Sequence, residues 1–268
     1  MRRFALLSIR TISARLRTPI LVALSLVIAS RGTAAQPDPW ALDLSEDRAG
    51  VSLGTARTAW WSGRAQLSYR REGKGGALLA VEPLRRFDAT DTTFIAAGWR
   101  QVGPWTAYAE AGGTPNADFH YRYSGQLEVF RRITGPWVGH AAYRHLAYSS
   151  QTVQLNSASL TREGGRTTLD SRLTLARNTT TDKNSLSMLA RGHVDVRPRL
   201  RLGGGIAIGD RIFDVTSLAG DPVRGWVAFA DARVGVGRGQ FVGLHARVAE
   251  EGSTFHQTAV GLTYRRTF

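Results

Sequence analysis

Charged and histidine side chains recur at alternate positions through the central and C-terminal parts of the chain. Both signs occur, so ion pairs can form wherever neighbouring segments pair as strands. The same groups could form a charged constriction that selects small anionic or glycan solutes. The candidates for lining such a lumen are Glu110, Arg122, Glu128, His140, Arg144, Asp170, Arg172, His193, Asp195 and Arg201.

The sequence gives little support for catalysis. His140 and His145 have opposite parity, so they cannot face one site from a regular strand. We find no spacing typical of metal ligands, no Gly-x-Ser-x-Gly elbow and no phosphate-binding loop. His145 with Ser149 or Ser150 is the only weak pair for a serine hydrolase. We therefore predict no catalytic, cofactor-binding or metal-binding residues, and no cofactor.

The elements that would position these residues are short alternating segments separated by Gly, Pro, Asn, Asp and Ser. This spacing predicts antiparallel strands in a single domain rather than βαβ units. Fourteen strands are expected, or twelve if segment 49–56 and one other do not form. The predicted strands cover 49–56, 58–71, 76–87, 91–102, 104–112, 121–132, 136–148, 151–162, 166–177, 185–196, 199–209, 223–237, 240–250 and 256–268.

The first 35 residues have the order of a secretory signal peptide. A basic region is followed by an apolar stretch from Pro19 to Ala29 and by the small residues Thr33-Ala34-Ala35. We expect cleavage between Ala35 and Gln36, then a periplasmic leader over 36–47 and a barrel over 48–268. An uncleaved N-terminal anchor is the alternative.

The C-terminus is typical of a strand that closes a transmembrane barrel. Val260, Leu262, Tyr264 and Phe268 share one parity, and a barrel in lipid turns its apolar parity outward. A soluble sandwich would turn the same residues inward, so alternation alone does not decide the faces. Tyr264 and Phe268 are the expected signal for the barrel-assembly machinery, although Arg266 occupies the third position from the end, where an aromatic residue is usual.

The connections favour the outer-membrane alternative. Short periplasmic turns should alternate with longer outer loops. The longest connections predicted, 210–222 and 113–120, both fall on the expected outer side, whereas 148–151 is short. We therefore expect a protein of the bacterial outer membrane that contacts its lipids, including lipopolysaccharide.

The excess of basic over acidic residues does not indicate a nucleic-acid partner. The formal net charge of the whole chain is +14, but residues 1–35 contain six arginines and no acid. The remainder has 29 basic and 21 acidic residues, without a basic cluster interleaved with aromatics. Arginine pairs with acids inside a barrel, or contacts with lipid phosphates at its rim, account for this composition.

Several short motifs resemble the YaiO-like family of Gram-negative outer-membrane β-barrels. The resemblance implies an outer-membrane barrel whose biochemical role is not established. Some members carry helical repeats ahead of the barrel, as exopolysaccharide secretion porins do, and this chain has no room for them. The motifs are Leu67-Ser68-Tyr69-Arg70-Arg71, Arg85-Arg86-Phe87 followed by Asp91, Thr114-Pro115-Asn116-Ala117-Asp118-Phe119, Trp137-Val138, and Tyr143-Arg144-His145.

These features lead to three functional hypotheses. The first is a structural barrel or narrow passive channel for small solutes, which is not an enzyme. The second is export or binding of a surface glycan. The third is a lipid-modifying outer-membrane enzyme.

Overall fold

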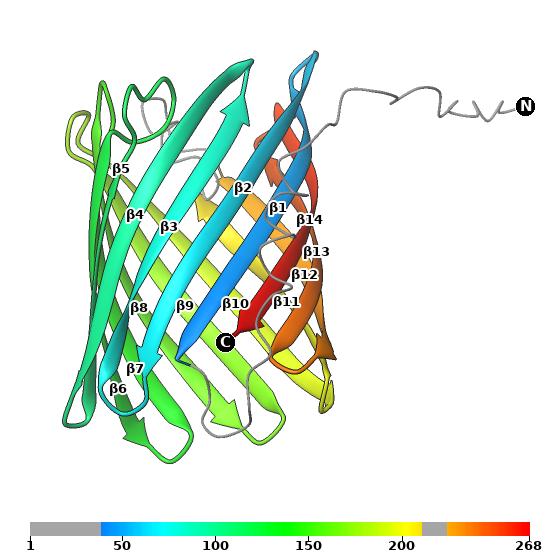
Figure 1. Cartoon of the computed structure of the whole chain (residues 1–268). Coiled ribbons are helices and arrows are strands. Elements are labelled where there is room, and N and C mark those ends of the chain that lie inside the picture. Colours follow the sequence, from blue (N-terminus) through cyan, green and yellow to red (C-terminus); the bar gives the residue numbers. More distant parts are fainter. Residues whose placement is uncertain (1–38, 211–223) are drawn as a thin grey trace, which may run out of the picture. The chain divides into compact units, whose positions relative to one another are not determined.

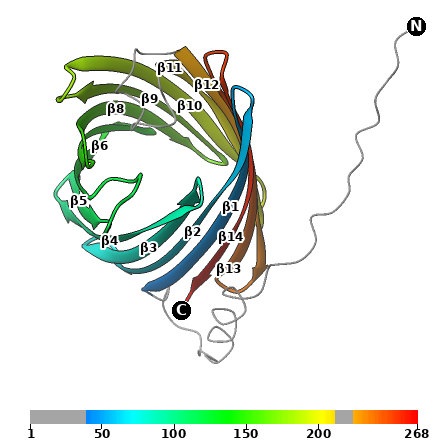
Figure 2. The same ribbon diagram turned by 90° about the horizontal axis from the view of Figure 1, so that it is seen from above.

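The computed structural model describes residues 39–210 and 224–268, which form a closed antiparallel β-barrel (Figure 1; Figure 2). Each strand pairs with its neighbours along the chain, and β1 pairs with β14. The all-β up-and-down barrel is confirmed, with fourteen strands rather than twelve. The strands are β1 (Trp40–Leu53), β2 (Ala56–Arg71), β3 (Gly75–Arg86), β4 (Ala89–Val102), β5 (Trp105–Gly113), β6 (Tyr123–Thr134), β7 (Trp137–Ala147), β8 (Thr152–Gly164), β9 (Thr167–Asn178), β10 (Lys183–Arg197), β11 (Leu200–Asp210), β12 (Arg224–Gly237), β13 (Gln240–Glu251) and β14 (Phe255–Thr267).

The first strand begins earlier than the sequence predicts. Residues 40–47, expected to be part of a periplasmic leader, instead lie in β1, where Ala41 pairs with Thr267. The acidic residues in this segment led to its assignment as a polar leader. Asp43 and Asp47 face the polar interior of the barrel, so their charge does not prevent a strand. The expected signal peptide and its cleavage site lie outside the described residues.

The two faces of the barrel have opposite polarity. Large apolar side chains point outward, and Leu127, Leu244 and Leu262 are each about 60% exposed. Polar side chains point inward, among them the buried Asp91 and Asp170. This inversion relative to a soluble barrel is the arrangement that lipid requires. Within the part of the chain that the structure describes, no helix is long and apolar enough to cross a membrane.

The two ends of the barrel differ in their connections. We call the end that carries the start of β1 and the end of β14 the turn end, where every connection has two or three residues. Glycines at positive φ, such as Gly103 and Gly135, make these tight turns. We call the opposite end the loop end. It carries the longest described connection, residues 114–122 between β5 and β6.

Buried apolar residues gather on the inner wall near the loop end. One cluster joins Tyr121, Leu146, Val153 and Ala176, from the 114–122 connection and strands β7, β8 and β9. Similar clusters lie on β1, β2 and β14, and on β11, β12 and β13. The middle of the inner wall is left to polar side chains, which make up the candidate site.

Candidate functional site: the inner wall of the barrel

Side chains alternate between the two faces of each strand, and one of these two sets lines the inner wall. The register fixes this, because residues paired across neighbouring strands point to the same face. Arg122 is the only one of the ten sequence candidates outside the strands; it lies in the 114–122 connection and is exposed. The other nine point to the inner face: Glu110, Glu128, His140, Arg144, Asp170, Arg172, His193, Asp195 and Arg201.

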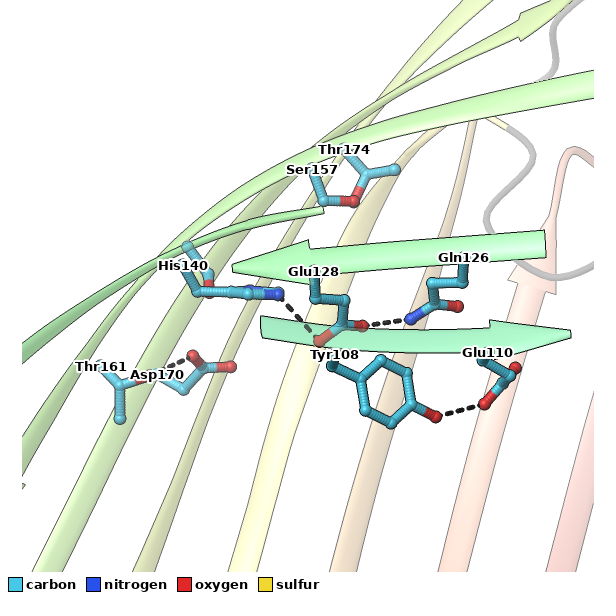
Figure 3. A network of polar contacts seen from close by, with 10 residues as sticks. Tyr108, Glu110, Gln126, Glu128, His140, Ser157, Thr161, Asp170 and Thr174 are labelled. Carbon is cyan, nitrogen blue, oxygen red and sulfur yellow. Dashed lines mark hydrogen bonds and ion pairs between the residues drawn. The ribbon is translucent and has the colours of Figure 1, made fainter. Parts of the chain in front are cut away.

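Polar side chains of β5, β6 and β7 form hydrogen bonds on this wall, one within β5, one within β6 and one that joins β6 to β7 (Figure 3). Tyr108 donates its hydroxyl proton to Glu110, and the Gln126 amide donates to Glu128. The other oxygen of Glu128 lies 3.1 Å from Nε2 of His140. The contact between Glu128 and His140 therefore joins β6 to β7 in addition to the backbone ladder.

His140 is the most enclosed of these hydrogen-bonded residues. The residue is 7% exposed, and its ring stacks on Phe130 with centroids 4.4 Å apart. Its Nδ1 lies 2.9 Å from the hydroxyl of Ser159. Glu128, His140 and Ser159 thus have the order of groups found in a serine-hydrolase triad, but the stacked, enclosed imidazole has little room to swing toward a substrate. The arrangement is that of a structural histidine with both nitrogens occupied.

Charge pairs hold much of the rest of the wall. Arg191 Nε lies 3.0 Å from Asp170, which also accepts a hydrogen bond from Thr161 at 2.8 Å. Arg201 binds both carboxylate oxygens of Asp195, at 2.6 and 2.9 Å. The first pair joins β9 to β10, and the second joins β10 to β11.

The 114–122 connection folds into the barrel rather than away from it (Figure 2). It is held by Asp91 of β4, a residue only 2% exposed. The Asp91 carboxylate accepts backbone hydrogen bonds from Asp118, Phe119 and His120, at 2.9, 3.0 and 2.7 Å. Three successive N–H groups around one carboxylate form an anion nest. This anchor narrows the interior near the loop end.

Two arginines flank the inward connection. The Arg86 guanidinium lies 4.3 Å from the ring centroid of Trp60 and 5.8 Å from that of Phe119. Arg144 lies 5.8 Å from the ring centroid of Tyr121. Burial raises the pKa of Tyr121 above its ordinary value, against the opposing effect of Arg144, so its phenol stays neutral. Arg86, Asp91, Phe119 and Arg144 all belong to motifs that carried the family resemblance, and the fold brings them together.

A hollow of about 890 Å³ lies along the inner wall from β10, by way of β14 and β1, to Arg86 of β3. It contains a contact between a histidine and an aspartate that crosses over a glycine. His193 of β10 and Asp231 of β12 approach to 3.6 Å. Gly203 of β11 lies between them, and a Cβ there would be 2.3 Å from the His193 ring. The missing side chain lets two residues from non-adjacent strands meet.

The same arrangement recurs three strands further round. Nε2 of His245 on β13 lies 2.5 Å from the carboxylate of Asp47 on β1. A Cβ on the intervening Gly261 would be 2.3 Å from that nitrogen. The register joins both pairs into one row across six strands: His193, Gly203, Asp231, His245, Gly261 and Asp47.

Some donors on the inner wall have no hydrogen-bond acceptor among the described residues. Nε of Arg172 and of Arg247 and the indole N–H of Trp60 are buried, and none hydrogen-bonds to a described residue. Trp60 and Arg247 border the hollow. Nor do Arg172, Arg233 and Arg247 form an ion pair with a described acid. The charges of these three guanidinium groups are therefore not neutralised by a described carboxylate.

The weak hydrolase pair does not form. His145 points to the outer face and stacks beside Tyr123, with ring centroids 6.3 Å apart. Ser149 and Ser150 lie in the connection after β7, and neither hydrogen-bonds to His145. Among residues 39–210 and 224–268, no group of three His, Asp or Glu side chains is placed to hold a metal ion.

Sequence reasoning missed three features of the site. Asp91 appeared only as part of a family motif. Its role depends on backbone N–H groups, which are the same in nearly all residue types and so give no signal in the sequence. Asp47 was placed in the leader. Gly203 has no side chain that would mark it as part of a site, yet it makes room for a pair on its two neighbouring strands. A signal was present for the last: on the strands beside Gly203 and beside Gly261, a histidine and an aspartate stand at inward positions.

Comparison with known proteins shows the fold and no closer relationship. No protein family matches the sequence, and no curated protein matches it. A solved structure described as the CymD monoaromatic hydrocarbon channel has a TM-score of 0.60 at 8% identity, covering 87% of this chain and 89% of that one. A bacterial polysaccharide outer membrane secretin has a TM-score of 0.57 at 8% identity, covering 84% and 98%.

A third similar structure is the KdgM porin in complex with disordered oligogalacturonate. Its TM-score is 0.51 at 6% identity, covering 85% of this chain and 99% of that one. The fold is therefore that of outer-membrane porins and channels. Together with the apolar outer face it supports the expected location in the bacterial outer membrane. The resemblance to the YaiO-like family stays a prediction.

Proposed function

We propose that this protein is a narrow passive channel of the outer membrane for small hydrophilic solutes. The observation that carries the proposal is the polar inner wall, which has a hollow of about 890 Å³ and an anchored inward connection. A barrel with a purely structural role would not need inward arginines, such as Arg172 and Arg247, that pair with no described acid. The similarity to porins and channels agrees with this role at the level of the fold.

The charges of the inner wall favour anions. The inward acids Asp170 and Asp195 are matched by Arg191 and Arg201, and Asp43 by Arg265 at 3.6 Å. Arg172, Arg233 and Arg247 are not matched in this way. An arginine fork suits carboxylate and phosphate groups. We therefore infer a preference for small anionic solutes.

Bilayer recording of the purified, folded protein tests the channel. We expect single-channel steps and, in a KCl gradient, a reversal potential that favours chloride. Arg172→Gln should move the reversal potential toward zero. Arg177→Gln is the matched control, because Arg177 stands on the same strand at an outward position. A barrel that inserts without conducting would reject the channel and leave only a structural role.

A second candidate function is passage or binding of a surface glycan. This candidate is supported by three aromatic side chains around the hollow, next to Arg247: Trp60, Phe229 and Phe255. Ring faces beside an arginine fork suit a sugar that carries a carboxylate. Support comes also from the similar structure described as a polysaccharide secretin, at the level of the fold. Deleting the protein should then alter envelope polysaccharide, and an unchanged polysaccharide profile would reject this candidate.

A further inference from the structure

An ion pair lies on the outer, lipid-facing side of β1. Arg48 donates from Nε and Nη2 to Oε1 of Glu46, both at 2.9 Å. The same oxygen accepts a hydrogen bond from the indole N–H of Trp61 on β2 at 3.0 Å. The three residues face away from Asp47 and Trp60, their chain neighbours, which border the internal hollow. This pair is therefore outside the proposed channel.

The pair lies where the surroundings are most apolar. Glu46 and Arg48 are at least five residues from either end of β1, which puts them near the middle of the membrane-spanning part. Their partners on β14 are Leu262 and Val260, 59% and 55% exposed. Charges on the lipid face are least tolerated at the bilayer midplane.

On the outer face of the described strands, no comparable charge occurs elsewhere. On every described strand other than β1, the outward charged or histidine residues lie within three residues of a strand end. Arg100, Arg131 and Arg162 near the turn end are examples. Such positions reach the headgroup region, where lipid phosphates and water are available. The centre of β1 offers neither.

The pair also keeps unused binding capacity. Oε1 of Glu46 accepts all three hydrogen bonds, whereas Oε2 accepts none from the described residues, and Nη1 of Arg48 donates none to them. The Arg48 side chain is 48% exposed and that of Glu46 21%. An acceptor and a donor of opposite charge are thus presented side by side to the hydrocarbon.

We infer that this surface is covered by a second copy of the same chain. In a symmetric dimer the twofold axis runs along the membrane normal, so the same patch meets itself. Barrel strands are tilted by roughly 35–45° from that axis, so two facing β1 strands cross. Crossing brings Glu46 of each copy beside Arg48 of the other. The free Oε2 and Nη1 then bind reciprocally, and four charges are enclosed in protein.

The chemistry of the patch selects this occupant. Lipid chains offer no charged group at the midplane of the bilayer. A protein partner with charges of only one sign would leave either Glu46 or Arg48 without an opposite charge. A surface carrying one acid and one base is complementary to itself. Leu44, Val260 and Leu262 around the pair supply an apolar border, and Gly50 leaves the surface flat on one side.

Cross-linking in outer membranes tests the dimer, because the chain contains no cysteine. Gly50→Cys places a thiol on the outer face with no atom within 4 Å of its Cβ. Ser171→Cys, at an outward position of β9 on another part of the wall, is the control. A short bismaleimide should join two copies of the Gly50→Cys protein and leave Ser171→Cys monomeric. Equal cross-linking of the two, none at Gly50→Cys, or capture of a different protein would overturn the inference.

Charge variants in the Gly50→Cys background separate the dimer from folding. Arg48→Glu should reduce dimer yield at least tenfold, because like charges then face each other. The exchange Glu46→Arg with Arg48→Glu should restore it, since opposite charges again meet within and between copies. Glu46→Leu with Arg48→Leu should give a folded monomer, as both charges are removed from lipid. An undiminished dimer in the leucine variant would refute the role of the pair. Channel conductance is measured separately and does not depend on this result.

Discussion

At the scale of single residues, His140 shows how a polar interior stabilises the barrel. Its two nitrogens join Ser159 and Glu128, and its ring stacks on Phe130. Removing a partner from a buried polar group costs more than the bond contributes, because the remaining group is left unsatisfied. Enclosure therefore makes the histidine structural, although its neighbours are those of a catalytic histidine.

We predict that His140→Ala lowers the free energy of unfolding by about 2 kcal/mol. The loss combines the ring stack with the unsatisfied Glu128 and Ser159. The control is His145→Ala on the same strand, which points outward and should change stability by less than about 0.5 kcal/mol. Urea unfolding in lipid vesicles, followed by tryptophan fluorescence, measures both. Equal effects for the two histidines would show that the enclosed network does not stabilise the fold.

At the scale of elements, the 114–122 connection owes its position to Asp91. Its three hydrogen bonds from backbone N–H groups are charge-assisted, and each such bond contributes about 1.5–3 kcal/mol. The connection is therefore a fixed part of the interior and does not sample the outside freely. Its exposed Arg122 gives a readout for release, since trypsin cleaves after arginine in accessible chain.

We predict that Asp91→Asn accelerates tryptic cleavage after Arg122 in the folded barrel about tenfold, which corresponds to about 1.4 kcal/mol. The amide has one acceptor oxygen instead of two and turns an N–H₂ group toward backbone donors. Asp88→Asn, three residues earlier in an exposed turn, should leave the cleavage rate unchanged. If Asp91→Asn were cut at the wild-type rate, the anchor would not be what holds the connection.

Local pattern predicted the strands well and the contacts between them poorly. Alternation and glycine turns located all fourteen segments because these signals lie within a dozen residues. The pair His245 and Asp47 is separated by 198 positions, and the anchor of Asp91 by up to 29. A pattern within a dozen residues cannot predict contacts at either separation. The start of β1 was misplaced for the same reason, because Arg265 and His245, which pair with its aspartates, are near the far end of the chain.

At the scale of the whole molecule, closure depends on the first and last strands. β1 and β14 pair from Ala41 with Thr267 to Leu53 with Phe255. Beyond them Trp40 and Phe268 exchange backbone hydrogen bonds of 3.3 and 3.0 Å. A barrel satisfies every backbone group in lipid only when it is closed. The half of β1 that the sequence assigned to a leader is therefore needed for the whole structure.

We predict that Ser45→Pro prevents formation of the closed barrel, whereas Ser45→Thr does not. Proline removes the backbone N–H and disrupts a ladder that has strands on both sides, at a cost of about 3 kcal/mol or more if its effect is as large as in a helix interior. Threonine keeps the N–H and favours a strand. Closed barrels resist SDS without heating and change mobility on boiling, so electrophoresis of heated and unheated samples reports closure. Ser45→Thr should show the heat-dependent shift and Ser45→Pro should lack it. A normal shift in Ser45→Pro would mean that residues 40–47 are dispensable, as a leader would be, and that the barrel closes on the later part of β1 alone.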